Sequence, residues 1–77
     1  NIDKVHEIAE KILGICREPN SFESVLQRLF RDYALTMNFE QYALVGSTVR
    51  SYLAWLKDTG ALSVLFEDSM LLWKTVP

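Results

Sequence analysis

Apolar residues recur with a helical period at the start of the chain. Between Ile2 and Cys16 they fall three or four positions apart, which predicts one amphipathic helix. Asn1 is the expected N-cap, because its side chain can accept a hydrogen bond from a free backbone N–H group of the first turn. Residues 17–19 end with a proline and stop the pattern.

A second stripe with the same period predicts a helix over residues 21–33. Two caps compete at its start. Asn20 forms a capping-box-like pair with Glu23, and Ser21 offers a hydroxyl one position later. Residues 35–37 continue no stripe and are expected to form a connection.

A third apolar stripe runs to Asp58, with Asn38 as the expected cap and Gly60 as the C-terminal stop. Gly46 interrupts this stripe, and glycine inside a helix costs about 1 kcal/mol relative to alanine. Because the stripe stays in phase across the glycine, we favour one long helix. The alternative is a short helix followed by a longer one capped by Ser47.

The tail changes to short runs of large apolar and β-branched residues at 62–66 and 70–73. Residues 67–69 separate them, which predicts a β-hairpin with a three-residue connection. Three helices followed by a hairpin give an α+β, mainly α, winged-helix fold. In this fold the second and third helices form the helix-turn-helix and the hairpin is the wing.

The chain of 77 residues is 49% hydrophobic, so we expect one winged-helix domain over residues 1–77. The sequence begins directly before a helical pattern and stops directly after a strand pattern, so we expect it to be the C-terminal part of a longer chain. The formal net charge of −2 argues against a nucleic-acid partner. With no membrane-spanning stretch, no secretory signal and only Cys16, we expect a cytoplasmic protein without membrane contact.

The residues that could carry chemistry are few and lack partners. His6 and Glu10 lie one helical turn apart and supply two metal ligands, whereas zinc sites use three or four. Cys16 falls on the apolar stripe, where a small buried hydrophobe is expected rather than an activated thiol. The remaining carboxylates are expected to be solvated, as are the adjacent Glu67 and Asp68 in the hairpin turn. We therefore expect no catalytic residue, cofactor or metal in this chain.

The third helix would be the recognition helix of a DNA-binding domain. Its outward residues include Thr48, Arg50, Ser51 and Lys57, which are the candidate DNA-facing positions. Glu40 and Asp58 offset the two basic residues, and the acidic hairpin turn would meet phosphates with the wrong sign. The fold therefore favours DNA binding and the charge opposes it.

The third helix also carries more apolar residues than one core stripe needs. Phe39, Leu44, Ala54 and Trp55 fall beside the main line, and we expect them to form a protein interface. Full burial of these residues under the first helix and the hairpin is the alternative. Trp73, on the last strand, is expected in the core.

The most distinctive stretch of the chain is residues 35–53, LTMNFEQYALVGSTVRSYL. Together with the leucine-rich segment 52–60, the strand 62–66 and Trp73, it resembles the C-terminal winged-helix domain of a branch of bacterial metallo-β-lactamase-fold hydrolases. The resemblance implies a non-catalytic accessory domain that packs on a catalytic domain or mediates assembly with a second copy. Zinc or iron would belong to that catalytic domain, because this chain has no counterpart of the family's metal motif. The alternative function is a DNA-binding module of a transcriptional regulator.

Overall fold

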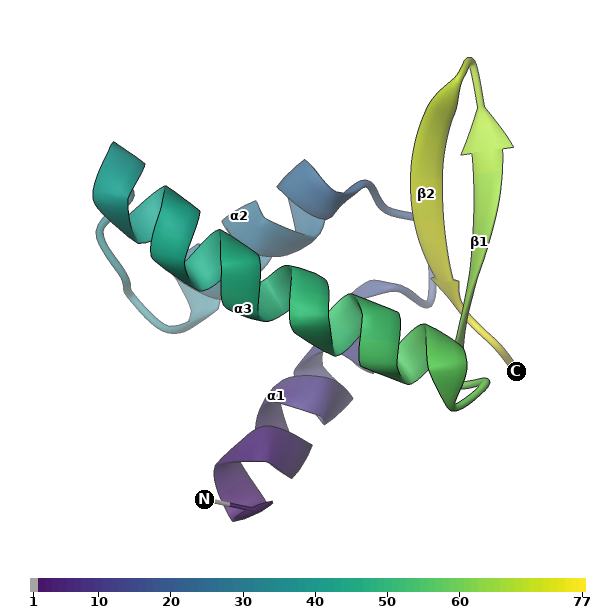
Figure 1. Ribbon diagram of the computed structural model, residues 1–77, viewed down its shortest axis with the longest axis horizontal. Helices are drawn as coiled ribbons and strands as arrows, with labels where there is room; N and C mark the ends of the chain where they lie inside the picture. Colours follow the sequence, from purple (N-terminus) through teal and green to yellow (C-terminus); the bar gives the residue numbers. More distant parts are fainter. Residues whose placement is uncertain (1) are drawn as a thin grey trace.

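The computed structural model describes residues 2–77, without the side chain of Ile2. Three helices precede an antiparallel hairpin (Figure 1), and their bounds are α1 (Ile2–Ile15), α2 (Phe22–Asp32), α3 (Phe39–Asp58), β1 (Leu62–Glu67) and β2 (Met70–Thr75). This order confirms the mainly helical α+β fold with a winged-helix-like arrangement. The expected cap at Asn1 lies outside the described residues.

Ser21 is the cap of α2. Its hydroxyl accepts a hydrogen bond from the backbone N–H of Ser24 at 3.2 Å. Asn20 is used differently, because its side-chain amide donates to the carbonyl of Ile15 at 2.9 Å. The backbone of Asn20 also pairs with Trp73 of β2 through bonds of 2.8 and 3.0 Å. These hydrogen bonds therefore hold the start of α2 beside the base of the hairpin.

Helix α3 is continuous from end to end. Asn38 caps it by accepting a hydrogen bond from the N–H of Gln41 at 2.9 Å. The helix passes through Gly46 without a break, so the alternative of two separate helices is wrong. Just beyond its end, Gly60 has a φ of +87° and donates to the carbonyl of Lys57 at 3.0 Å. This left-handed position is the expected glycine stop.

The hairpin has a shorter connection than the sequence predicted. Glu67 and Met70 are the last paired residues, which leaves a two-residue turn instead of three. Asp68 and Ser69 have φ values of 54° and 63°. Two successive positive φ values are typical of the type I′ turn, whose twist matches that of the strands. The turn therefore forms without the glycine that usually marks it in a sequence.

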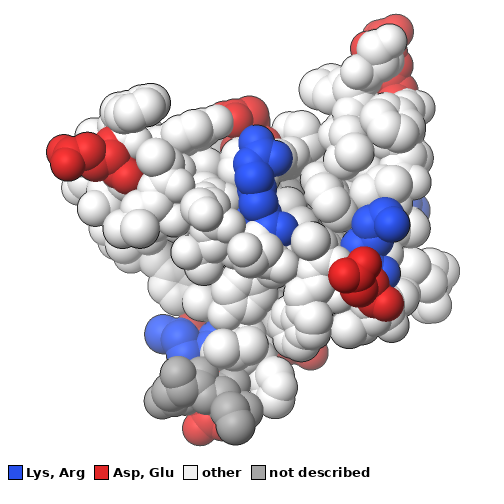
Figure 2. Space-filling model, viewed as in Figure 1, with Lys and Arg blue, Asp and Glu red and all other residues white. Residues whose placement is uncertain are grey.

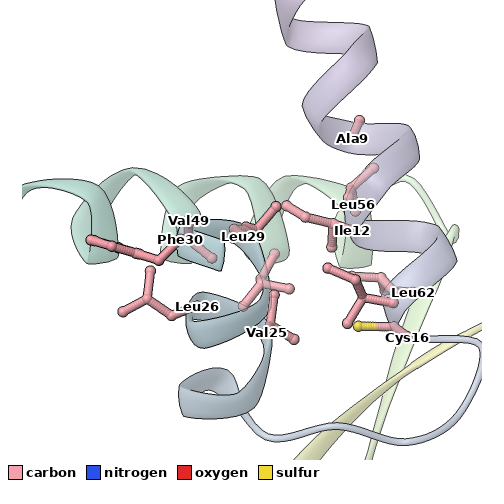
Figure 3. Close-up of a cluster of buried hydrophobic side chains, with 12 residues drawn as sticks. Ala9, Ile12, Cys16, Val25, Leu26, Leu29, Phe30, Val49, Leu56 and Leu62 are labelled. Carbon is pink, nitrogen blue, oxygen red and sulfur yellow. The ribbon is translucent and has the colours of Figure 1, made fainter. Parts of the chain in front are cut away.

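One apolar core joins the three helices and the base of the hairpin, and Figure 3 shows its side chains converging from α1, α2 and α3. Trp73 is partly buried and packs against this core, as predicted. Among the described residues, the core contains no buried polar or charged residue. Its members are Ala9, Ile12, Ile15, Cys16, Val25, Leu26, Leu29, Phe30, Val49, Leu53, Leu56 and Leu62.

Candidate interaction surfaces

The single thiol is shielded from solvent. Cys16 is fully buried, as predicted, and burial raises the pKa of its thiol to about 11. His6 lies exposed on α1. Within residues 2–77, no group of three or more histidine, cysteine, aspartate or glutamate side chains is arranged to hold a metal ion.

Asp32, Glu40 and the adjacent pair Glu67 and Asp68 lie in three different parts of the fold. Asp32, at the end of α2, forms an ion pair with Lys11 of α1 at 3.4 Å. Glu40 is exposed in the first turn of α3. Glu67 and Asp68 are exposed at the hairpin tip, where Figure 2 shows acidic side chains projecting into solvent. Each of these carboxylates is therefore exposed to solvent.

The four predicted interface residues are all exposed, but they lie on different sides of α3. The exposed fractions are 81% for Phe39, 66% for Leu44 and 42% for Trp55. Leu44 and Trp55 are eleven positions apart, which places them on one line along the helix. Ala54 faces a hollow on a neighbouring side, and Phe39 is the first residue of the helix. Of the four, only Leu44 and Trp55 therefore lie on one line of the helix.

An apolar cleft of about 270 Å³ lies beside this line. It opens between α1, the end of α2 and α3, and Tyr52 connects it to the neighbouring Trp55. The two rings meet edge to face, with centroids 6.2 Å apart and planes at 66°. The cleft is lined by Lys4, Ile8, Leu29, Tyr33, Leu35, Val45, Thr48, Val49 and Tyr52.

A polar cluster borders the cleft at Tyr33. The Tyr33 hydroxyl donates to the carboxylate of Glu7 at 2.6 Å, which raises the pKa of Tyr33 to about 12 and lowers the pKa of Glu7. The amino groups of Lys4 and Lys11 lie 5.4 and 5.7 Å from the centroid of the Tyr33 ring. The cluster joins the exposed side of α1 to the end of α2.

The candidate DNA-facing residues are also divided between surfaces. Thr48 lines the apolar cleft, whereas Arg50 and Ser51 line a hollow on another side of α3. The hydroxyl of Ser51 donates to the backbone carbonyl of Ser47, in its own helix, at 3.3 Å. Lys57 is exposed near the end of α3. The polar groups therefore do not form one continuous row along the helix.

The second hollow, which we call the α2–α3 hollow, has a volume of about 500 Å³. Arg50 lies over the ring of Phe22, with the guanidinium carbon 3.7 Å from the ring centroid. Within residues 2–77 the guanidinium group forms no ion pair. The nearby Tyr42 hydroxyl donates to the carboxylate of Glu23, which raises the pKa of Tyr42. The lining residues are Phe22, Tyr42, Ala43, Gly46, Ser47, Arg50, Ser51 and Ala54.

Sequence reasoning found neither hollow, because each one is formed by residues from different helices. Figure 2 shows a mostly uncharged face with a few basic and acidic side chains on it. Comparisons with protein families, curated proteins and solved structures find no match. No helix within residues 2–77 has both the length and the apolar character needed to cross a membrane.

Proposed function

We propose that this chain is a non-catalytic interaction domain that docks on a protein partner through the outer side of α3. The observation that carries the proposal is the exposed pair Leu44 and Trp55 on one line of the helix, beside the apolar cleft. Exposed apolar area of this kind is typical of a partner site, and tryptophan is a favoured anchor. The cleft offers room for an apolar side chain of the partner.

The resemblance of residues 35–53 favours one partner, the catalytic domain of a metallo-β-lactamase-fold hydrolase. In that arrangement the catalytic zinc or iron belongs to the partner domain, and this domain shapes access or assembly. A second copy of the chain is the other protein partner that we expect. The buried, protonated thiol of Cys16 fits a reducing compartment such as the cytoplasm.

Charge argues against the alternative, a DNA-binding module. A recognition helix and wing supply basic groups that neutralise phosphates. Here α3 carries Glu40 and Asp58 beside its two basic residues, and the hairpin tip is the acidic pair Glu67 and Asp68. A gel shift with random duplex DNA at low salt tests this point directly. Tight binding that weakens steeply with salt would favour the DNA-binding function over ours.

The docking surface is tested by comparing the isolated domain with the complete protein encoded by its open reading frame. We expect a His-x-His-x-Asp-His segment in that frame, and slower amide hydrogen exchange over residues 44–55 in the complete protein. Leu44→Ala and Trp55→Ala should restore the faster exchange of the isolated domain. Val76→Ala, which shortens another exposed apolar side chain, is the control and should leave the protection unchanged. Equal exchange in the two proteins would contradict docking through α3.

The same variants distinguish an interface residue from a core residue. Because Trp55 is 42% exposed, we expect Trp55→Ala to lower the free energy of unfolding of the isolated domain by about 1–2 kcal/mol. Leu53→Ala, at a fully buried position on the same helix, should cost roughly 2–5 kcal/mol. A loss for Trp55→Ala as large as that for Leu53→Ala would show that Trp55 serves mainly to hold the fold.

A further inference from the structure

The outer half of the hairpin is apolar and uncovered. Phe66 and Met70 are 69% and 52% exposed, on either side of the tip that carries Glu67 and Asp68. The fold does not bury these two apolar side chains. The hairpin therefore presents an acidic tip flanked by large apolar groups, a combination that favours contact with a complementary protein surface.

The strand register shows which way the two faces of the hairpin turn. Phe66 pairs with Leu71, and Val64 pairs with Trp73, so these residues share one face. Since Trp73 packs against the core, this face turns toward the helices. The opposite face carries the pair Glu67 and Met70 near the tip.

A complementary surface exists on the helical part of the same chain. Figure 2 shows the hairpin standing clear of the helices, with a notch between the two. The α2–α3 hollow includes Phe22, two residues after Asn20, which is paired with β2. In this hollow Arg50 lies over the ring of Phe22 and, within residues 2–77, forms no ion pair with a carboxylate. An oriented guanidinium group of this kind is a good anchor for carboxylates.

We propose that two copies of the domain clasp each other by their hairpins. The hairpin of each copy enters the notch of the other, so that the faces bearing Phe66 meet across a twofold axis. The opposite face, with Glu67 and Met70, then lies against the α2–α3 hollow of the other copy, where the acidic tip reaches Arg50. Both copies make the same contacts, as a closed twofold dimer requires.

Charge complementarity favours a second copy over other occupants of the notch. The chain itself carries both the acidic tip and the basic anchor, so a twofold dimer makes the contact between tip and Arg50 twice. A nucleic acid would meet one basic side chain in the lining of the hollow, Arg50, whereas the acidic Glu67 and Asp68 at the hairpin tip would repel its phosphates. The proposal rests on the proposed function only in taking protein as the partner, because it uses a different side of α3 from Leu44 and Trp55.

Charge reversal tests the proposal by sedimentation of the 77-residue domain. We expect Arg50→Glu alone, and Glu67→Lys with Asp68→Lys, each to weaken self-association by about tenfold or more. A mixture of these two variants should associate again, because each mixed contact pairs opposite charges. Lys57→Glu makes the same charge change outside the hollow and is the control, expected to leave association unchanged. Circular dichroism of each variant checks that the fold is intact.

Several outcomes would overturn the clasped dimer. One is a wild-type domain that stays monomeric at millimolar concentration, and another is a mixture of folded variants that fails to associate. Self-association that is lost on Trp55→Ala but insensitive to the charge reversals would also overturn it, while leaving the proposed function in place. Duplex DNA binding that Arg50→Glu abolishes would assign the hollow to phosphate, and would contradict both proposals.

Discussion

Gly46 offers a sharp test of how the floor of the α2–α3 hollow is built. It is buried inside α3, facing α2, and its substitution by alanine adds one methyl group there. A Cβ atom at this position would lie 3.4 Å from Cζ of Phe22 and 3.7 Å from a terminal methyl carbon of Leu26. Both are van der Waals contacts with side chains, so the methyl group fits against α2 with almost no movement.

The expected effect of Gly46→Ala is stabilisation. Alanine is favoured over glycine inside a helix by about 1 kcal/mol. The Phe22 ring is only partly buried and can yield by a few tenths of an ångström, so the tighter of the two contacts offsets little of this gain. We expect the free energy of unfolding to rise by about 1 kcal/mol and the melting temperature to rise by about 4–8 °C for a domain of this size.

Urea denaturation of the isolated domain measures the change, and Gly14→Ala is the matched control. Gly14 is exposed near the end of α1, and a Cβ atom there would meet nothing within 4 Å, so only helix propensity acts. The difference between the two variants isolates the packing contribution at Gly46. If Gly46→Ala lowers the free energy of unfolding while Gly14→Ala raises it, the contact with Phe22 is tighter than argued and the reasoning is refuted.

Three further predictions concern single groups. Ala34, which follows the C-cap residue Tyr33 of α2, has a φ of +54°. This left-handed position costs a residue with a side chain about 1–2 kcal/mol, so Ala34→Gly should raise the melting temperature, and an unchanged value would count against this strain. Cys16, with its pKa raised to about 11, should react with a disulfide reagent only as fast as the domain opens, and rapid labelling of the folded protein would contradict its burial. The hydrogen bond between Tyr33 and Glu7 should stabilise the fold below pH 10, and this contribution should fade as the pH rises toward the Tyr33 pKa of about 12. It should also fade in acid as Glu7, whose pKa is lowered by the Tyr33 hydroxyl and by Lys4, takes up a proton. Tyr33→Phe should abolish the alkaline dependence and weaken the acid one, with the Glu7 pKa moving toward 4.5 in an NMR titration.

Helices were predictable from this sequence because their signals are local. The apolar period gave α2 and α3 their ranges, and Asn38 and Gly60 marked the ends of α3 correctly. Two local details needed the structure. Of the two competing caps, Ser21 rather than Asn20 caps α2, because Asn20 is engaged with Ile15 and with β2. The hairpin turn is one residue shorter than predicted, because its two central residues adopt positive φ without a glycine.

Surfaces were less predictable, because they depend on which elements come together. The exposure of Leu44 and Trp55 followed from their place beside the apolar stripe. Nothing in the sequence pairs Arg50 with Phe22, which is 28 positions away and in another helix. The exposure of Phe66 was equally hidden, because a run of large apolar residues predicts a buried strand. It is exposed because the hairpin extends beyond the helices that cover its base.

The two proposed contacts use different sides of α3, and this has a consequence for how the domain works. Trp55 and Arg50 are five positions apart, which corresponds to about 140° around the helix. A partner docked on Trp55 and the apolar cleft would therefore leave Arg50 and the hairpin free to clasp a second copy. The domain would act as a bridge, holding two copies of a docked partner in a symmetric pair.

If the domain acts as a bridge, Trp55→Ala and Arg50→Glu should act independently. Trp55→Ala should release the docked partner and leave self-association intact, and Arg50→Glu should weaken self-association and leave the partner docked. In the double variant the two losses should add in free energy, as they do for sites without shared contacts. A double variant whose losses fall well short of additive would show that the two surfaces are one, and that the dimer itself forms the docking site.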